Sequence, residues 1–210
     1  MDKKRAKVVE LAGLPAAGKS TIIDILEKKM RDEGINCRVV PTASSISPIS
    51  NYKTEWTFDI WSLCRTVQQL IEVSKDTDNK LILMERGLID SICWLEFFKN
   101  SGQVEQSVLE TIKEFVFIPE WFNRIDLVIV LQIKFETALA RGRETGKITN
   151  SVMYTHLRKA YDSTLKNLQL KKHYSNIVVY ETDNLSPSDM YKFSIEQLNF
   201  IDNTILGSIK

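Results

Sequence analysis

The chain has 210 residues, of which 43% are hydrophobic, and its formal net charge is +1. This length and composition predict one domain spanning residues 1–210 with a single sizeable core. A charge so close to zero argues against nucleic acid or a membrane surface as a partner. We expect a cytoplasmic protein, because the chain begins without an apolar leader and its three cysteines have neither disulfide nor metal spacing.

The first predicted element is a strand, KVVELAG, which leads into the P-loop pattern G-x-x-x-x-G-K-[ST]. Gly13 and Gly18 permit backbone conformations in which successive N–H groups converge on phosphate oxygens. A helix that follows such a loop points its positive end at the same place. In this pattern Lys19 reaches the β- and γ-phosphates and the Ser20 hydroxyl ligates Mg²⁺. The predicted contacts with ATP are Gly13, Ala16, Ala17, Gly18, Lys19, Ser20 and Thr21.

Short runs rich in β-branched residues recur along the chain, and each is followed by a segment of helical character. They read AKVVELA, NCRVVP, KLILME, DLVIVLQ and NIVVY. Runs that are apolar throughout are typical of parallel strands covered on both faces. We therefore predict the three-layer α/β fold of P-loop NTPases, with a five-stranded parallel sheet and helices on both of its faces.

Apolar periodicity predicts several of the helices. One helix lies between residues 56 and 71, and its apolar face carries Trp56, Ile60, Leu63, Val67 and Leu70. A second helix spans Val152 to Leu168, with an apolar stripe that we expect to include Val152 and His156. The last helix begins at SPSD, with Ser186 as its cap and Pro187 in its first position.

The third strand is followed by two charged residues in LILMERGLIDS. Ligands of open parallel sheets bind at the carboxyl ends of the strands, so Glu85 and Arg86 are placed beside the phosphate site. Glu85 can hold Mg²⁺, directly or through water, and Arg86 can clamp a phosphate oxygen. The alternative is an ordinary charged strand end, and the P-loop favours the functional interpretation.

A basic, glycine-containing segment, ARGRETGKITN, follows the fourth strand and a short helix. Arg141 and Arg143 would place positive charge over a phosphoryl group in transfer, and a lid would exclude water. We predict a lid over about residues 141–150, with a solvated loop as the alternative.

Taken in order, these motifs resemble the thymidylate-kinase branch of the P-loop nucleotide kinases. The resemblance rests on GLPAAGKST, WSLCRT, ERGLIDS and ARGRETGK, and it covers residues 7–183. It implies that Trp61 stacks on the base of the acceptor and that Arg65 and Arg86 hold the acceptor phosphate. The implied catalytic residues are Lys19, Glu85, Arg86, Arg141 and Arg143, and the implied metal ligands are Ser20 and Glu85.

The chain departs from this pattern in ways that concern the acceptor. Glu85 stands where thymidylate kinases have aspartate, and the related deoxynucleoside kinases carry glutamate there. Those nucleoside kinases also place a glutamate base after the second strand, but VVPTASSISPISNYK has no carboxylate before Glu55. The Arg-Glu-Pro-Gly segment of thymidylate kinases is missing from the same region. An acceptor that is already a phosphate needs no base, which favours a nucleoside monophosphate.

The sequence thus predicts an ATP- and Mg²⁺-dependent phosphotransferase whose acceptor is a nucleoside monophosphate. A kinase for deoxynucleosides or other small molecules is the alternative, as is a P-loop regulator without turnover. A GTPase-like switch is disfavoured, because the Asn-Lys-x-Asp guanine motif is absent. The expected partner is a small nucleotide or nucleoside, and the sequence leaves a homodimer open.

Overall fold

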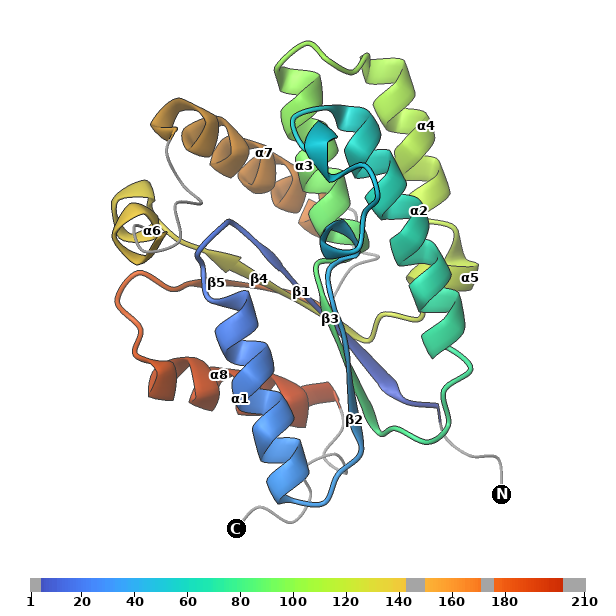
Figure 1. The fold of residues 1–210 in the computed structure, drawn as a ribbon, viewed down its shortest axis with the longest axis vertical. Helices are drawn as coiled ribbons and strands as arrows, with labels where there is room; N and C mark the ends of the chain where they lie inside the picture. Colours follow the sequence, from blue (N-terminus) through green and yellow to red (C-terminus); the bar gives the residue numbers. More distant parts are fainter. Residues whose placement is uncertain (1–4, 143–149, 171–175, 202–210) are drawn as a thin grey trace.

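The computed structural model describes residues 5–142, 150–170 and 176–201 (Figure 1). Its centre is an all-parallel five-stranded sheet with the strand order β2-β3-β1-β4-β5. The strands are β1 (Lys7–Gly13), β2 (Cys37–Val40), β3 (Leu81–Glu85), β4 (Leu127–Gln132) and β5 (Ile177–Glu181). The predicted strands and the predicted fold class are confirmed.

The register of the sheet brings the predicted phosphate site together. Strand β1 is central and pairs with β3 from Lys7↔Leu81 to Leu11↔Glu85. On its other side it pairs with β4, where Gly13 lies opposite Leu131. The carboxyl ends of β1 and β3 are therefore neighbours, so the P-loop after β1 and the charged residues after β3 lie at one edge of the sheet.

Helices cover both faces of the sheet (Figure 1). Helix α1 packs against α8 on one face, and α3 packs against α2, α4 and α7 on the other. The helices are α1 (Lys19–Asp32), α2 (Trp56–Val73), α3 (Leu88–Asn100), α4 (Gln106–Val116), α5 (Pro119–Phe122), α6 (Phe135–Gly142), α7 (Ser151–Leu170) and α8 (Pro187–Ile201). Two 3-10 turns, Ala43–Ser45 and Ser50–Tyr52, connect β2 to α2. None of the described helices is both long enough and apolar enough to cross a membrane.

Alternating side chains of β1 belong to two apolar clusters. Val9 and Leu11 are part of the larger cluster, which includes α1 and α8 and also residues of α3 and α7. Val8 of β1 and Ile82 of β3 point the other way, into a cluster with α2 and α3. Because both faces are buried, the strands carry apolar residues at successive positions, which explains the pattern seen in the sequence.

The predicted helices exist, but one predicted stripe is partly wrong. In α2 the residues Leu63, Val67 and Leu70 are buried as expected. In α7, however, Val152 and His156 are exposed, and the buried face is formed by other residues. It consists of Tyr154, Leu157, Ala160, Tyr161, Leu165 and Leu168. The spacing of three and four residues along this set defines a face that Val152 and His156 do not share.

The start of α8 follows its sequence signature. The Ser186 hydroxyl donates to Asp189 Oδ2 over 2.6 Å, and the Asp189 N–H donates back to the Ser186 hydroxyl over 3.2 Å. This reciprocal pairing satisfies polar groups at the helix start, with Pro187 in the first turn where its missing N–H is harmless.

Candidate active site

The P-loop adopts the backbone that its glycines predict. Gly13 and Gly18 have φ angles of 132° and 102°, in the region that side chains disfavour. At Gly13 the space is also limited, because a β-carbon there would lie 2.1 Å from the carbonyl oxygen of Leu131. Ala16 has a positive φ of 60° as well. The loop therefore holds a conformation that exposes backbone N–H groups at the start of α1.

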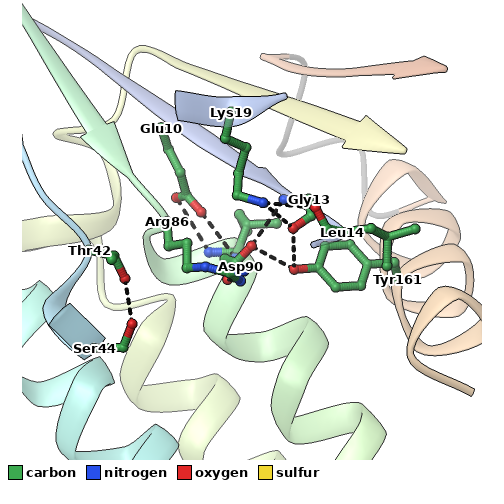
Figure 2. A network of polar contacts seen from close by, with 10 residues as sticks. Glu10, Gly13, Leu14, Lys19, Thr42, Ser44, Arg86, Asp90 and Tyr161 are labelled. Atoms are coloured by element: carbon green, nitrogen blue, oxygen red, sulfur yellow. Dashed lines mark hydrogen bonds and ion pairs between the residues drawn. The ribbon is translucent and has the colours of Figure 1, made fainter. Parts of the chain in front are cut away.

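Lys19 lies buried beneath this loop. Its ammonium group donates to the carbonyl oxygens of Gly13 (2.8 Å) and Leu14 (2.9 Å), as Figure 2 shows. Burial, together with the nearby positive charge of Arg86, lowers the pKa of Lys19 to about 7. Phosphate oxygens placed beside the ammonium group would favour its charged form, so the site is suited to an anion.

Ser20 and Glu85 meet at the same edge of the sheet. The Ser20 hydroxyl donates to Glu85 Oε1 over 2.7 Å, which links the first turn of α1 to the end of β3. A hydroxyl and a carboxylate are the hard oxygen ligands that Mg²⁺ prefers, and Mg²⁺ typically takes few protein ligands beside phosphate and water. These two residues therefore fit a Mg²⁺ ion bound together with a nucleotide.

These residues line one wide cavity, which we call the nucleotide cavity. It is lined by Pro15, Ala16, Gly18, Lys19, Ser20, Thr21, Glu85, Arg86, Arg141, Gly142, Leu185 and Met190. Arg141 is held there by hydrogen bonds to the carbonyl oxygens of Thr182 (2.6 Å) and Asp183 (3.5 Å). Of the predicted site residues, Gly13 and Ala17 lie behind the lining, and Arg143 lies outside the described residues. Most of the predicted lid, residues 143–149, lies outside them too.

Arg86 is fixed by a buried carboxylate, Asp90. Nη1 of Arg86 donates to Asp90 Oδ2, and the guanidinium carbon lies 5.8 Å from the centre of the Trp94 ring. Although burial disfavours the guanidinium charge, Asp90 raises the pKa of Arg86 above its ordinary value. Arg86 also has a positive φ of 61°, which a residue other than glycine rarely adopts. Its position is thus closely determined.

Asp90 connects three elements of the site. Besides Arg86, its side chain accepts the N–H of Gly13 (3.0 Å) and the hydroxyl of Tyr161 (2.6 Å), both at Oδ1. Asp90 is only 2% exposed, and Tyr161 is fully buried. Figure 2 shows Asp90 between Arg86 and Tyr161, with the P-loop residue Gly13 close by. The P-loop, α3 and α7 are therefore joined at one carboxylate.

A second cavity, which we call the acceptor cavity, lies on the other side of Arg86. It is lined by Thr42, Ala43, Ser44, Lys53, Phe58, Asp59, Ser62, Thr66, Arg86, Gly87, Asp90, Ser91, Trp94 and Phe98. The space between its walls, open mouth included, is about 670 Å³. Three aromatic side chains give it flat apolar walls. Arg86 lines both cavities, so it marks the place where they meet.

Trp61 and Arg65, which the sequence suggested as acceptor ligands, do not line this cavity. Arg65 instead donates to Gln68 Oε1 over 3.1 Å and lies 3.5 Å from Glu72 Oε1, along its own helix. The reason is the rotation of α2 about its own axis. The face of α2 that carries Phe58 and Ser62 lines the cavity, whereas Trp61 lies on the neighbouring face of the helix. A role for Trp61 and Arg65 in binding an acceptor therefore has no support from the lining of this cavity and stays a prediction.

Other residues of the site were missed because their signals are weak in a single sequence. Asp59 and Ser62 stand at positions that look solvent-exposed on an amphipathic helix. Asp90 follows Arg86 by four residues, a spacing that on a helix allows an ion pair, and this could have suggested the pairing. That Asp90 also binds the P-loop and Tyr161 depends on tertiary structure.

Comparisons with known proteins identify the fold. No protein-family model matches the sequence, and no curated protein matches it. Among solved structures it resembles deoxyadenosine kinase from M. mycoides with bound dATP, at 20% identity and a TM-score of 0.69, covering 91% of this chain and 99% of that one. The same enzyme with bound dCTP gives 19% identity and a TM-score of 0.66, covering 92% and 99%. The same enzyme with the products dCMP and dCDP gives 19% identity and a TM-score of 0.69, covering 92% of this chain and 99% of that one. The chain thus has, over nearly its whole length, the P-loop kinase fold of these deoxyadenosine kinases.

Proposed function

We propose that the protein is an ATP- and Mg²⁺-dependent kinase that phosphorylates a hydroxyl group of a nucleoside, with deoxynucleosides as the acceptor class. The observation that carries this proposal is that Arg86 lines both the nucleotide cavity and the acceptor cavity. A phosphoryl group passing from one cavity to the other would pass beside a fixed, charged guanidinium. Such positioning and charge stabilisation account for most of the catalysis of phosphoryl transfer.

The nucleotide cavity supplies the parts that the donor needs. Lys19 would neutralise the β- and γ-phosphates, while Ser20 and Glu85 would hold Mg²⁺. Mg²⁺ held by these two residues would offset the negative charge that develops on the phosphates. Arg141, held by the segment after β5, adds a positive charge on the opposite wall. A regulator without turnover would not require the second cavity next to these groups.

The charges of the acceptor cavity favour an uncharged acceptor over a nucleoside monophosphate. Its cationic lining residues are Lys53 and Arg86, and Arg86 is already paired with Asp90. Asp59 places a second carboxyl group in the same wall. A dianionic phosphate would therefore lie beside two carboxyl groups, which opposes its binding. The likeness to deoxyadenosine kinases supports the same choice, so we replace the monophosphate preference with its alternative.

A substrate screen tests this function. The purified protein is incubated with MgATP and a panel of deoxynucleosides, ribonucleosides, nucleoside monophosphates and simple alcohols. ADP release is measured, and the phosphorylated product is identified by mass spectrometry. We expect a deoxynucleoside monophosphate as the product. Lys19→Ala should give no product, because it removes the positive charge that the wild type places beside the β- and γ-phosphates. The proposal would be contradicted if only nucleoside monophosphates were phosphorylated, or if none of the compounds in the panel was. Cytoplasmic localisation and dimerisation stay predictions.

A further inference from the structure

Two polar groups in the wall of the acceptor cavity have no partner in the part of the chain that the structure describes. Oδ2 of Asp59 and Oγ of Ser62 are buried and lack a hydrogen bond. Both side chains line the cavity from α2, three residues apart and hence on the same face of the helix. Buried polar groups are normally paired, and an unpaired one calls for a specific explanation such as a ligand.

The other polar groups that line the cavity either already make hydrogen bonds within the protein or are not carboxylates. Asp90 accepts three hydrogen bonds, from Gly13, Tyr161 and Arg86. The segment after β2 contributes Thr42 and Ser44, whose hydroxyl groups lie 3.0 Å apart and pair with each other (Figure 2). Among the described lining residues, Asp59 is therefore the carboxyl group that offers a buried, unpaired oxygen to a ligand.

A hydroxyl acceptor needs a group that takes its proton. Asp59 is a carboxyl group in the right place to do so. We propose that Asp59 is the catalytic base of the phosphoryl transfer, with Ser62 binding the acceptor beside it. The inference rests on the proposed function. It places the base on α2 and not directly after β2, where the chain has no carboxylate before Glu55.

The step balances without any further reactant. The acceptor hydroxyl donates its hydrogen bond to the Asp59 carboxylate, and its oxygen attacks the γ-phosphorus of ATP. The new P–O bond forms as the bond from the γ-phosphorus to the bridging oxygen breaks, and ADP leaves with that electron pair. The proton passes to Asp59 and from there to solvent after the product leaves. Arg86, at the junction of the cavities, stabilises the charge on the transferred group.

The electrostatic surroundings of Asp59 suit a base. Burial raises the pKa of Asp59 well above its ordinary value, Asp90 raises it further, and Arg86 opposes both. Lys53, from the segment before α2, is the other charged residue in the lining. A base works best when its pKa lies near the working pH, because it is then both available and sufficiently basic. The rate should therefore fall on the acidic side at a pH above the usual range of an aspartate.

The test compares Asp59→Asn with Glu55→Gln in the full-length protein. Glu55 is the matched control, because it is the first carboxylate after β2 in the chain but is exposed and does not line the cavity. We expect Asp59→Asn to lower kcat by about 10²- to 10⁴-fold with little change in the KM for ATP. It should also remove the acidic limb of the pH profile of kcat/KM. Glu55→Gln should match the wild type in both respects.

A second variant keeps the inference testable if the amide disturbs the fold. In Asp59→Ala, added formate should restore part of the lost kcat, since a small carboxylate can occupy the space and accept the proton. Retention of kcat within about threefold by Asp59→Asn, an unchanged acidic limb, or no response to formate would overturn the role of Asp59. These outcomes differ from failure of the proposed function, in which the wild type itself phosphorylates no nucleoside.

Discussion

Glu10 and Gly87 approach each other so closely that a β-carbon on Gly87 would lie 2.4 Å from Cδ of Glu10. This contact places a carboxyl group of β1 under the first turn of α3. Glu10 is fully buried, and it accepts the N–H groups of Ile89 (3.4 Å) and Asp90 (3.0 Å). It therefore helps to set the orientation of the helix that carries Asp90. Gly87→Ala should displace Glu10 and lower the melting temperature.

The buried Glu10 should make stability depend on pH. Burial raises its pKa from 4.5 to about 8 in the folded chain. Between these values the folded state holds the proton more tightly than the unfolded state, so stability is greatest below the lower value and falls as the pH rises through the upper one. Glu10→Gln cannot ionise, and its melting temperature should gain on the wild type as the pH rises. The difference should reach a few kcal/mol in unfolding free energy near about pH 9.

Thermal melts from about pH 5 to about pH 9 measure this dependence. Glu114→Gln is the control, because Glu114 is exposed on α4 and its replacement should give no such trend. A constant difference between Glu10→Gln and wild type at every pH would show that Glu10 does not titrate in this range.

Tyr161 should contribute to stability through Asp90. Phenylalanine at this position removes the 2.6 Å hydrogen bond to Asp90 Oδ1 and the longer one (3.4 Å) to the Gly13 carbonyl oxygen, and we expect it to preserve the packing of α7. Loss of one bond to a buried charged group should lower the free energy of unfolding by about 1–3 kcal/mol, measured by urea denaturation. The exposed Tyr52 offers the control Tyr52→Phe, which should have no measurable effect. Equal stability of Tyr161→Phe and wild type would mean that Asp90 is held by its other partners alone.

The pair Ser20 and Glu85 should determine the response to Mg²⁺. Glu85→Gln keeps the shape of the side chain but removes the negative charge that attracts the ion. We expect a much lower kcat and a higher Mg²⁺ concentration for half-maximal rate, with metal-free ATP binding nearly unchanged. Steady-state kinetics over a Mg²⁺ titration, beside calorimetry with ATP in chelator, check this. A normal kcat at limiting Mg²⁺ would assign Glu85 to structure alone.

Replacement of Arg65 should distinguish the two classes of acceptor. Its ion pair with Glu72 lies along α2 outside the acceptor cavity, so Arg65→Ala should alter kcat/KM for the acceptor by less than about twofold and stability by less than about 1 kcal/mol. Ser62→Ala, three residues earlier but within the cavity, should lower kcat/KM for the acceptor clearly. If Arg65→Ala instead lost activity with a nucleoside monophosphate while Ser62→Ala did not, the monophosphate interpretation would return.

The conformation of the P-loop and its place in the sheet could be predicted from sequence because their determinants are local. The P-loop consists of consecutive residues, Gly13 to Thr21, whose backbone geometry the glycines impose, and its contacts with ATP stay predictions. The position of Glu85 and Arg86 follows from a general rule on parallel strands, and the register of β1 and β3 agrees with it. Arg141 could be selected as a candidate from the sequence because positive charge was expected after the fourth strand.

The acceptor half could not be predicted in the same way, because α2 has two inward faces. Leu63, Val67 and Leu70 pack into the core and produce the apolar periodicity. Phe58 and Ser62 face the cavity, and a polar residue that lines a cavity has the same appearance in a sequence as one that faces water. The tilt and rotation of α2 against α3 decide between these possibilities, and both arise from packing between distant parts of the chain.

The attachment of Asp90 to Gly13, Arg86 and Tyr161 also bears on how the protein moves during a catalytic cycle. Because these bonds tie the P-loop to α3 and α7, the floors of the two cavities are expected to shift as one body. Opening and closing around the acceptor must then come from its outer wall, the segment from Thr42 to Lys53 between β2 and α2. Amide hydrogen exchange should be slow around Asp90 and fast in that wall, and acceptor binding should slow the exchange of the wall selectively.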